Sequence, residues 1–132
     1  MNIVRLSGLD PRLYDLVAPL VMNPAILRQN NNYPFKTTYR HVWYIAIVDE
    51  NVIGFMPIKK TKEGNCIDNY YISGDDPSII TWLLDYIVED VDSDSMLTAL
   101  VHKRHVDVFR RHHFHTNKEW KNYDKMQYDR KT

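Results

Sequence analysis

A short turn after an apolar run holds the first group of residues that could do chemistry. Its sequence is SGDDPSII, residues 73–80, and a helical pattern follows it. The first backbone N–H groups of a helix are unpaired and lie at the positive end of the helix dipole, so such a turn can hold a phosphate group. Alternatively, Asp76 caps the helix, Pro77 takes its first position and Asp75 is solvated. The two aspartates favour the cap, because carboxylates repel a phosphate.

Six histidines raise the question of a metal site. His102 and His105 are three residues apart on an expected helix, and His112, His113 and His115 cluster at its end. Ligand pairs do occur at such spacing. However, no cysteine joins them, no HExxH or Cys-x-x-Cys pattern is present, and the helix dipole also favours histidine at a helix C-terminus. We therefore predict no metal site.

Lys103, Arg104, Arg110 and Arg111 form a basic segment in a chain that is otherwise neutral. The 17 basic and 17 acidic residues cancel, so the overall charge gives no argument for a nucleic-acid or membrane-surface partner. The segment is either a solvated helix face or a site for a phosphate-bearing or acidic partner. A nucleic-acid partner is kept only as an alternative.

Periodicity and turn signals predict the elements that position these residues. Helices are expected at 11–22, 77–91 and about 103–112, and strands at 2–6, 41–48, 52–60, 66–72, 96–101, 118–123 and 125–129. The second and third strands form an antiparallel hairpin, and Pro19 should kink or end the first helix. With the two closing strands counted as one element, the order β-α-β-β-β-α-β-α-β predicts one α/β domain over residues 1–132.

The size and composition of the chain are those of one globular domain, with 132 residues and 44% hydrophobic side chains. The single cysteine, Cys66, excludes an internal disulfide and fits a reducing compartment. No window approaches the roughly 20 apolar residues of a membrane span. Arg5 and Asp10 interrupt any signal-peptide core. We expect a soluble cytoplasmic protein with no membrane partner.

Two stretches and the element order carry a resemblance to a known family. WYIAIVDENVIGFMPI at 43–58 looks like a hairpin whose second strand begins with "V-x-G", and VHKRHVDVFRRHHF at 101–114 ends on a matching phenylalanine, Phe114. Together with the strand-helix-strand finish, these features resemble the GNAT family of N-acetyltransferases over nearly the whole chain. The resemblance implies a GNAT-like acyl-CoA N-acyltransferase fold of the α+β type, with a mixed, mostly antiparallel sheet of six or seven strands flanked by helices.

The resemblance also implies an acetyl-CoA site. Family members hold the pantetheine arm where the third long strand splays from the strand after the main helix, and the pyrophosphate on the N-terminus of that helix. Lys103 and Arg104 would lie near the adenosine 3′-phosphate. The implied cofactor-binding residues are Tyr71, Ile72, Ser73, Ser78, Ile79, Ile80, Lys103 and Arg104.

The family's "R/Q-x-x-G-x-G/A" phosphate loop is degenerate in this chain. Asp75 or Asp76 takes the Arg/Gln position, and Ser78 and Ile80 replace the glycines. Pro77 removes one N–H group. Like charges about 4 Å apart repel by roughly 1–4 kcal/mol, so a pyrophosphate would meet repulsion where the family offers a cation.

The resemblance gives catalytic roles to two residues of the third strand. Asp68 is the candidate base that removes the ammonium proton through water. Phe109 stands where the family has the tyrosine that protonates the leaving thiolate, so Tyr70, or Tyr71, is the candidate replacement. The alternatives are that Asp68 points to solvent and that the tyrosine belongs to the core.

The leading hypothesis is a divergent acetyl-CoA-dependent N-acetyltransferase. It would transfer an acyl group to an unknown small-molecule or peptide amine that enters beside the loop 28–40. The alternative is a non-catalytic GNAT-shaped binding module that has lost the coenzyme A site and binds a protein or nucleic acid. A homodimer is possible, because an exposed final strand would allow pairing between chains.

Overall fold

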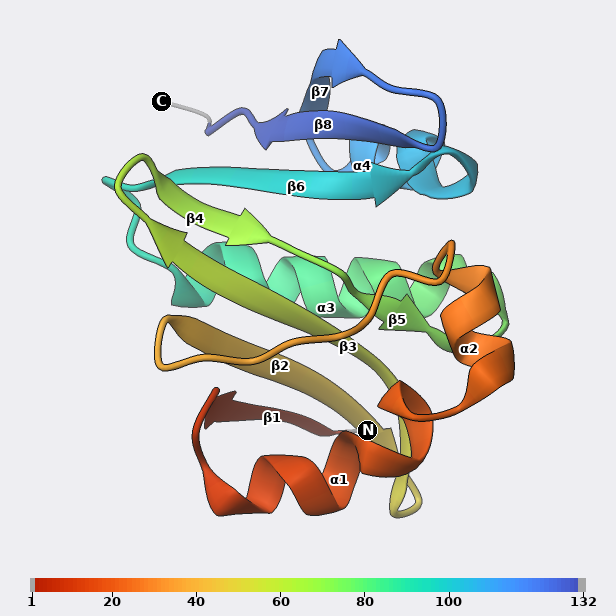
Figure 1. The fold of residues 1–132 in the computed structure, drawn as a ribbon. Coiled ribbons are helices and arrows are strands. Elements are labelled where there is room, and N and C mark those ends of the chain that lie inside the picture. Colours follow the sequence, from red (N-terminus) through yellow and green to blue (C-terminus); the bar gives the residue numbers. More distant parts are fainter. Residues whose placement is uncertain (1, 131–132) are drawn as a thin grey trace.

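An eight-stranded sheet forms the centre of the molecule (Figure 1). The computed structural model describes residues 2–130. The strands are β1 (Asn2–Ser7), β2 (His41–Val48), β3 (Asn51–Thr61), β4 (Gly64–Ile67), β5 (Tyr71–Ile72), β6 (Met96–His102), β7 (Phe114–Glu119) and β8 (Tyr123–Tyr128). The helices are α1 (Pro11–Val21), α2 (Pro24–Gln29), α3 (Pro77–Asp90) and α4 (Val106–Arg111), with 3₁₀ turns η1 (Ser73–Asp75) and η2 (Lys103–His105).

The strands follow the order β1-β2-β3-β4-β6-β8-β7, and β5 pairs with β3. Every pairing is antiparallel except that of β4 with β6. A parallel pair needs a long crossover, which α3 supplies here. This mixed, mostly antiparallel sheet flanked by helices confirms the predicted architecture, with one strand more than the upper number expected.

The extra strand arises because the third long strand is broken. Its first part, β4, runs parallel to β6 as far as the pair Ile67–Ala99. Asn69 then takes a left-handed conformation, with φ of 56°, and the chain leaves β6 but stays beside β3, where Tyr71 of β5 pairs with Phe55. The predicted strand 66–72 is therefore two short strands, and a gap between β5 and β6 opens after Ile67 (Figure 1).

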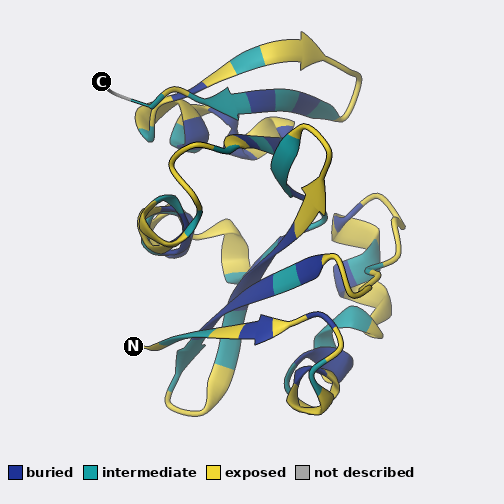
Figure 2. Ribbon diagram, turned by 90° about the vertical axis from the view of Figure 1, so that its left-hand side faces the viewer, coloured by how far each residue is buried: buried dark blue, intermediate teal, exposed yellow. Residues whose placement is uncertain are grey.

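Helices cover both faces of the sheet (Figure 2). Along β2, side chains alternate between the faces, as the pleat requires. The face under α3 buries Tyr44, Met56, Ile67, Ile80, Leu83 and Ile87, among others. The face under α1 buries Leu6, Leu13, Val17, Trp43, Ile45 and Phe55. The two cores fix the sheet between the helices and so fix the positions of the residues at the gap.

Helix α1 does not end at Pro19, where the sequence analysis expected a kink or an end. It begins at the predicted position, where the Asp10 carboxylate accepts a hydrogen bond from the Arg12 N–H at 2.9 Å. It then continues through Pro19 and ends at Val21. The next turn, at Asn23, starts α2.

The closing strands lie earlier than predicted. Phe114 is buried against Phe109 and starts β7 directly after α4, so the predicted strand 118–123 covers the turn between β7 and β8. The last strand, β8, lies between β6 and β7. The expectation of an exposed final strand is therefore wrong, and β7 is the outer strand on that side.

Candidate functional site

The turn before α3 is occupied by the chain's own groups. The Asp76 carboxylate accepts hydrogen bonds from the backbone N–H of Ser78 at 2.9 Å and from its hydroxyl at 2.7 Å. These hydrogen bonds lower the pKa of Asp76. The N–H groups of Ile79 and Ile80 bind the Asp76 carbonyl at 3.1 and 3.4 Å. With Pro77 in the first position, the N–H groups expected to hold a pyrophosphate all have partners.

The neighbouring Asp75 also has partners of its own. Its Oδ1 accepts hydrogen bonds from the Arg104 Nε at 2.9 Å and the His105 Nε2 at 2.8 Å. Partial burial raises the pKa of Asp75, but the hydrogen bonds from Arg104 and His105 outweigh burial and lower it overall. Lys103 pairs with the buried Asp124. The two basic residues expected near a cofactor phosphate are thus both paired with carboxylates.

Tyr70 reaches into the gap from the break between β4 and β5. It is 2% exposed, and its hydroxyl lies 2.6 Å from the His105 Nδ1. The same hydroxyl accepts a hydrogen bond from the His102 N–H at 3.2 Å. Burial raises the pKa of Tyr70 strongly, so its proton stays on the oxygen.

The three side chains Asp75, His105 and Tyr70 form one hydrogen-bonded chain. Burial lowers the pKa of His105, so the ring is neutral near pH 7. A carboxylate only accepts hydrogen bonds, so the His105 Nε2 carries the proton and donates it to Asp75. The His105 Nδ1 then accepts the Tyr70 O–H. This Asp75–His105–Tyr70 chain ties the start of α3 to the segment after β6.

Aromatic rings fill the rest of the gap. The Tyr70 ring packs against His102, His105 and Phe109 at centroid distances of 5.2, 5.6 and 5.8 Å. The cavity left beside Tyr70, His102, His105 and Asn30 has a volume of about 10 Å³. That volume is enough for one water molecule. A pantetheine arm does not fit there while Tyr70 holds this position.

The remaining predicted cofactor residues lie around this closed gap. Tyr71 packs its ring against Phe55, at 5.6 Å, on the α1 face of the sheet. Ile72 is buried in the core under α3, together with Ile79 and Ile80. Ser73, in the turn that follows, is half-buried. Of the eight predicted cofactor residues, Tyr71, Ile72, Ile79 and Ile80 therefore pack in the two cores, and Ser78, Lys103 and Arg104 are exposed.

Asp68 lies on the other side of the break, in an open pocket of about 130 Å³. The pocket is lined by Tyr33, Asp68, Asn69, Leu100, His102, Trp120 and Tyr123. Within residues 2–130, the Asp68 carboxylate has no hydrogen-bond or ion-pair partner. Sequence reasoning named Asp68 but missed Trp120 and Tyr123, because it placed the turn between β7 and β8 inside a strand.

The floor of this pocket carries no positive charge. Burial, with a smaller contribution from Arg104, lowers the pKa of His102 to about 4, so its ring is neutral near pH 7. Its Nδ1 atom is buried and has no partner among the described residues. The His102 ring packs against Tyr123, at 4.9 Å, on the adjacent strand.

Hydrogen bonds hold the loop that walls the pocket. Asn31 donates to the Tyr123 hydroxyl at 3.1 Å, and Asn69 donates to the Pro34 carbonyl at 2.8 Å. Asn30 donates to the Tyr33 carbonyl at 2.8 Å. Segments far apart in the sequence, 30–34, 68–70 and 120–123, therefore meet around one pocket.

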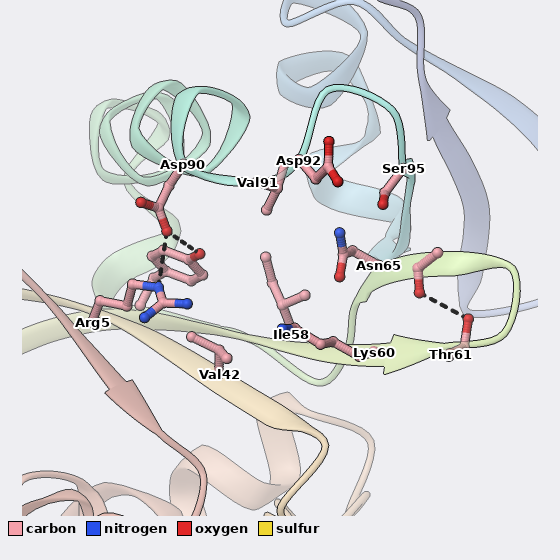
Figure 3. A pocket seen from close by; sticks show the side chains of 12 residues that line it. Arg5, Val42, Ile58, Lys60, Thr61, Asn65, Asp90, Val91, Asp92 and Ser95 are labelled. Carbon is pink, nitrogen blue, oxygen red and sulfur yellow. Dashed lines mark hydrogen bonds and ion pairs between the residues drawn. The ribbon is translucent and has the colours of Figure 1, made fainter.

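Another pocket, of about 270 Å³, lies at the C-terminal end of α3 (Figure 3). In it, the Arg5 guanidinium and the Tyr44 hydroxyl both bind the Asp90 carboxylate, at 2.9 and 2.6 Å. Burial and the Asp90 carboxylate raise the pKa of Tyr44 to about 12. Lys60 and Asp92 add further charges of opposite sign. None of the predicted site residues lines this pocket, and its mixed charges select no ligand charge.

Across residues 2–130, no three His, Cys, Asp or Glu side chains come close enough together to hold a metal ion. In that range, no helix is long and apolar enough to cross a membrane.

Comparisons by sequence found no relative, since no family model and no curated protein match this chain. Comparison with solved structures found similar proteins. Escherichia coli ElaA matches with a TM-score of 0.74 at 12% identity, over 98% of this chain and 100% of that one. An acyl-CoA N-acyltransferase from Pseudomonas aeruginosa matches with a TM-score of 0.75 at 10% identity, over 98% and 100%.

A third match carries the cofactor. A GNAT family acetyltransferase from Elizabethkingia anophelis, with acetyl-CoA bound, has a TM-score of 0.60 at 13% identity, over 96% of this chain and 94% of that one. Identities this low establish the fold alone. The resemblance seen in the sequence is therefore confirmed at the level of the fold, which is that of the GNAT acetyltransferases.

Proposed function

We propose that this chain is a non-catalytic binding module with the GNAT fold, which does not use acetyl-CoA as an acyl donor. One observation carries the proposal. The Tyr70 side chain, 2% exposed and bound to His105 and to the His102 N–H, fills the gap between β5 and β6. In acyltransferases with this fold, that gap is where the pantetheine arm is expected.

The arrangement at the start of α3 supports the same conclusion. An incoming pyrophosphate would have to displace the Asp76 carboxylate from the Ser78 N–H and would then face the Asp75 carboxylate. Arg104, the nearby cation, is already bound to Asp75. The residues present therefore do not fit acetyl-CoA in this conformation, at either the pantetheine or the pyrophosphate end.

The second candidate is the divergent N-acetyltransferase, and Asp68 is the observation that favours it. Its carboxylate is unpaired among residues 2–130 and lies in an open pocket beside the gap. A carboxylate there could accept the proton of an ammonium acceptor. For this function, Tyr70 would have to leave the gap and Asp76 its cap. The buried Tyr70 hydroxyl, with its raised pKa, is a poor proton donor in the present arrangement.

Product analysis distinguishes the two candidates. The purified chain is incubated with acetyl-CoA and a panel of small amines and lysine-containing peptides, and acetylated products are measured by mass spectrometry. A binding module forms no more product than buffer does. Product that depends on the protein, and that is lost in Asp68→Asn but kept in Asp107→Asn, would replace the proposal with the acetyltransferase. Asp107 is a suitable control because its side chain is 85% exposed on α4 and does not line the pocket.

A further inference from the structure

We propose that the pocket at the C-terminal end of α3 binds a free amino acid with an apolar side chain, in its zwitterionic form. This α3-end pocket is lined by Arg5, Tyr44, Ile58, Lys60, Asn65 and Asp92, among others. Helix α3 has 14 residues, so the pocket lies about 21 Å along the helix from the turn at Asp76. The inference therefore goes beyond the proposed function and holds for either of the two candidate functions.

Two charges of opposite sign stand on opposite walls of this pocket. Figure 3 shows Lys60 on the wall formed by β3 and Asp92 on the wall formed by the segment after α3. Among residues 2–130, neither side chain forms an ion pair. One Asp92 oxygen accepts the Asp94 N–H at 2.9 Å, and the second has no partner in that range. A ligand with both an ammonium and a carboxylate group can pair with both walls, whereas a ligand with a single charge would meet one like charge.

The other charged groups of the pocket balance each other. The Arg5 guanidinium lies 2.9 Å from the Asp90 carboxylate, and the Tyr44 hydroxyl donates to the same carboxylate at 2.6 Å. This pair leaves the charges of Lys60 and Asp92 uncompensated by the protein. The lining therefore favours a ligand that carries separated charges but no net charge.

The floor of the pocket is apolar, and neutral polar groups stand above it. Ile58 is 2% exposed, and Val42 and Val91 pack against the same core under α3. These three side chains offer a surface for an aliphatic side chain. The Asn65 amide and the Ser95 hydroxyl also line the pocket and form no side-chain hydrogen bond within residues 2–130. Each can donate to a carboxylate and accept from an ammonium group.

The pocket is large enough for such a ligand, and its walls are held in place. Its volume is about 270 Å³. A cavity of roughly 150 Å³ accommodates a benzene molecule, so an amino acid of the size of leucine fits. The Arg130 guanidinium binds the carbonyls of Asp92 and Ser95 at 3.0 and 3.1 Å, and the Thr61 hydroxyl binds the Gly64 carbonyl at 2.9 Å. Preorganised walls reduce the ordering that binding requires.

The same lining disfavours two other classes of ligand. A hard metal ion needs six or more oxygen ligands, and within residues 2–130 no three acidic, histidine or cysteine side chains come together. A phosphate group would face the carboxylates of Asp90 and Asp92, with Lys60 as the one cation of the lining that no carboxylate neutralises.

A titration followed by NMR tests the proposal directly. Uniformly ¹⁵N-labelled protein is titrated with L-leucine at constant pH and ionic strength. Two probes of similar shape each lack one charge, because isocaproate has no ammonium group and isoamylammonium has no carboxylate. We expect saturable shifts of the Asn65, Val91, Asp92 and Ser95 amides with leucine, and at least about tenfold weaker binding of either probe. Glycine, which lacks the apolar side chain, should also bind at least about tenfold more weakly than leucine.

Variants of the two charged residues separate the two ends of the ligand. Lys60→Gln and Asp92→Asn should each weaken leucine binding by about tenfold, and Asp92→Asn keeps an oxygen that can accept the Asp94 N–H. In Lys60→Gln, isoamylammonium should bind as well as leucine, because the ligand carboxylate has lost its partner. Lys62→Gln and Asp94→Asn, in the same two segments but outside the pocket, are matched controls that should leave binding unchanged. All four side chains are exposed, so these variants are expected to fold.

Three results would overturn the proposal. They are the absence of saturable shifts with leucine, equal binding of leucine and either single-charge probe to the wild type, and leucine binding that survives both Lys60→Gln and Asp92→Asn. None of them bears on the proposed function, which concerns the gap at the other end of α3 and is tested by product analysis. Acetylated product in that assay would in turn leave the α3-end pocket as it is.

Discussion

At the residue scale, the site depends on two carboxylates and one tyrosine that lie close in sequence but differ in their surroundings. Asp75 is paired with Arg104 and His105, and Tyr70 is buried under the same histidine. Asp68 remains unpaired in an open pocket. Within the segment 68–75, Tyr70 and Asp75 thus belong to a closed hydrogen-bonded cluster, whereas the Asp68 carboxylate is available to a ligand.

The Tyr70 hydroxyl should contribute to stability as well as fill the gap. Tyr70→Phe removes the partner of the His105 Nδ1 and of the His102 N–H, both in a buried environment. A loss of roughly 1–3 kcal/mol in the free energy of unfolding is expected. Urea denaturation measures it. Tyr14→Phe, on the exposed surface of α1, is the control and should change little. No loss in Tyr70→Phe would mean that these hydrogen bonds are not formed.

The buried histidines predict how stability depends on pH. Burial lowers the pKa of His102 to about 4 in the folded state, from 6.5 for an exposed histidine, so the unfolded chain binds the extra proton first. The free energy of unfolding should therefore fall as the pH drops from 6.5 towards 4, by up to about 3 kcal/mol from His102. His105, whose folded pKa is also lowered, adds to this loss.

Urea titrations at a series of pH values measure this slope. His102→Leu should flatten it. His115→Gln should leave it in place or steepen it slightly, because His115 pairs with Asp129 and its folded pKa is raised. A slope that is the same in wild type and His102→Leu would show that His102 is not buried in its neutral form.

At the element scale, the break between β4 and β5 creates both the gap and the open pocket that Asp68 lines. β4 can lie against β6 only because Gly64 starts it, with φ of 137°. A Cβ at this position would lie 2.4 Å from the Met96 carbonyl oxygen, which belongs to the backbone of β6. The parallel pair that defines one side of the site thus depends on this glycine.

A pair of glycine variants tests that dependence. Gly64→Ala should destabilise the protein by roughly 2 kcal/mol or more, because it combines backbone strain with a clash against β6. Gly74→Ala also places alanine at a positive φ, of 62°, but its Cβ would meet no atom within 4 Å. It should cost only about 1 kcal/mol. Thermal or urea unfolding of both variants measures the difference, and equal losses would argue against the close approach of β4 to β6.

At the scale of the whole molecule, the parts that the sequence predicted are those with strong local patterns. The hairpin of β2 and β3 and the cap of α3 at Asp76 follow from residues close together in the chain. The break after Ile67 does not, because CIDNYYI has the apolar character of one continuous strand. It is divided because β4 pairs with both β3 and β6, whereas β5 pairs with β3.

The sequence alone could not predict that the gap between β5 and β6 is closed, because the closure depends on the topology of the sheet. Tyr70 and His105 are 35 residues apart and meet because α3 carries the chain back to β6 beside β4. Along the sequence, the histidines after β6 suggest a metal site, a helix-dipole effect or part of a basic segment, and none of these roles predicts a hydrogen bond to Tyr70. Tyr70 was expected as a catalytic acid, and its burial favours the alternative that it belongs to the core.

Whether acetyl-CoA has room to bind in the gap between β5 and β6 distinguishes the two proposed functions. Calorimetric titration of the wild-type protein with acetyl-CoA, alongside a Tyr70→Gly/Asp76→Asn double variant, measures this most directly. We predict no detectable binding by the wild type. Binding by the double variant alone would identify the two closing side chains as the obstacle. Micromolar binding by the wild type would contradict the account, because it would mean that Tyr70 leaves the gap readily and that the coenzyme A site is intact.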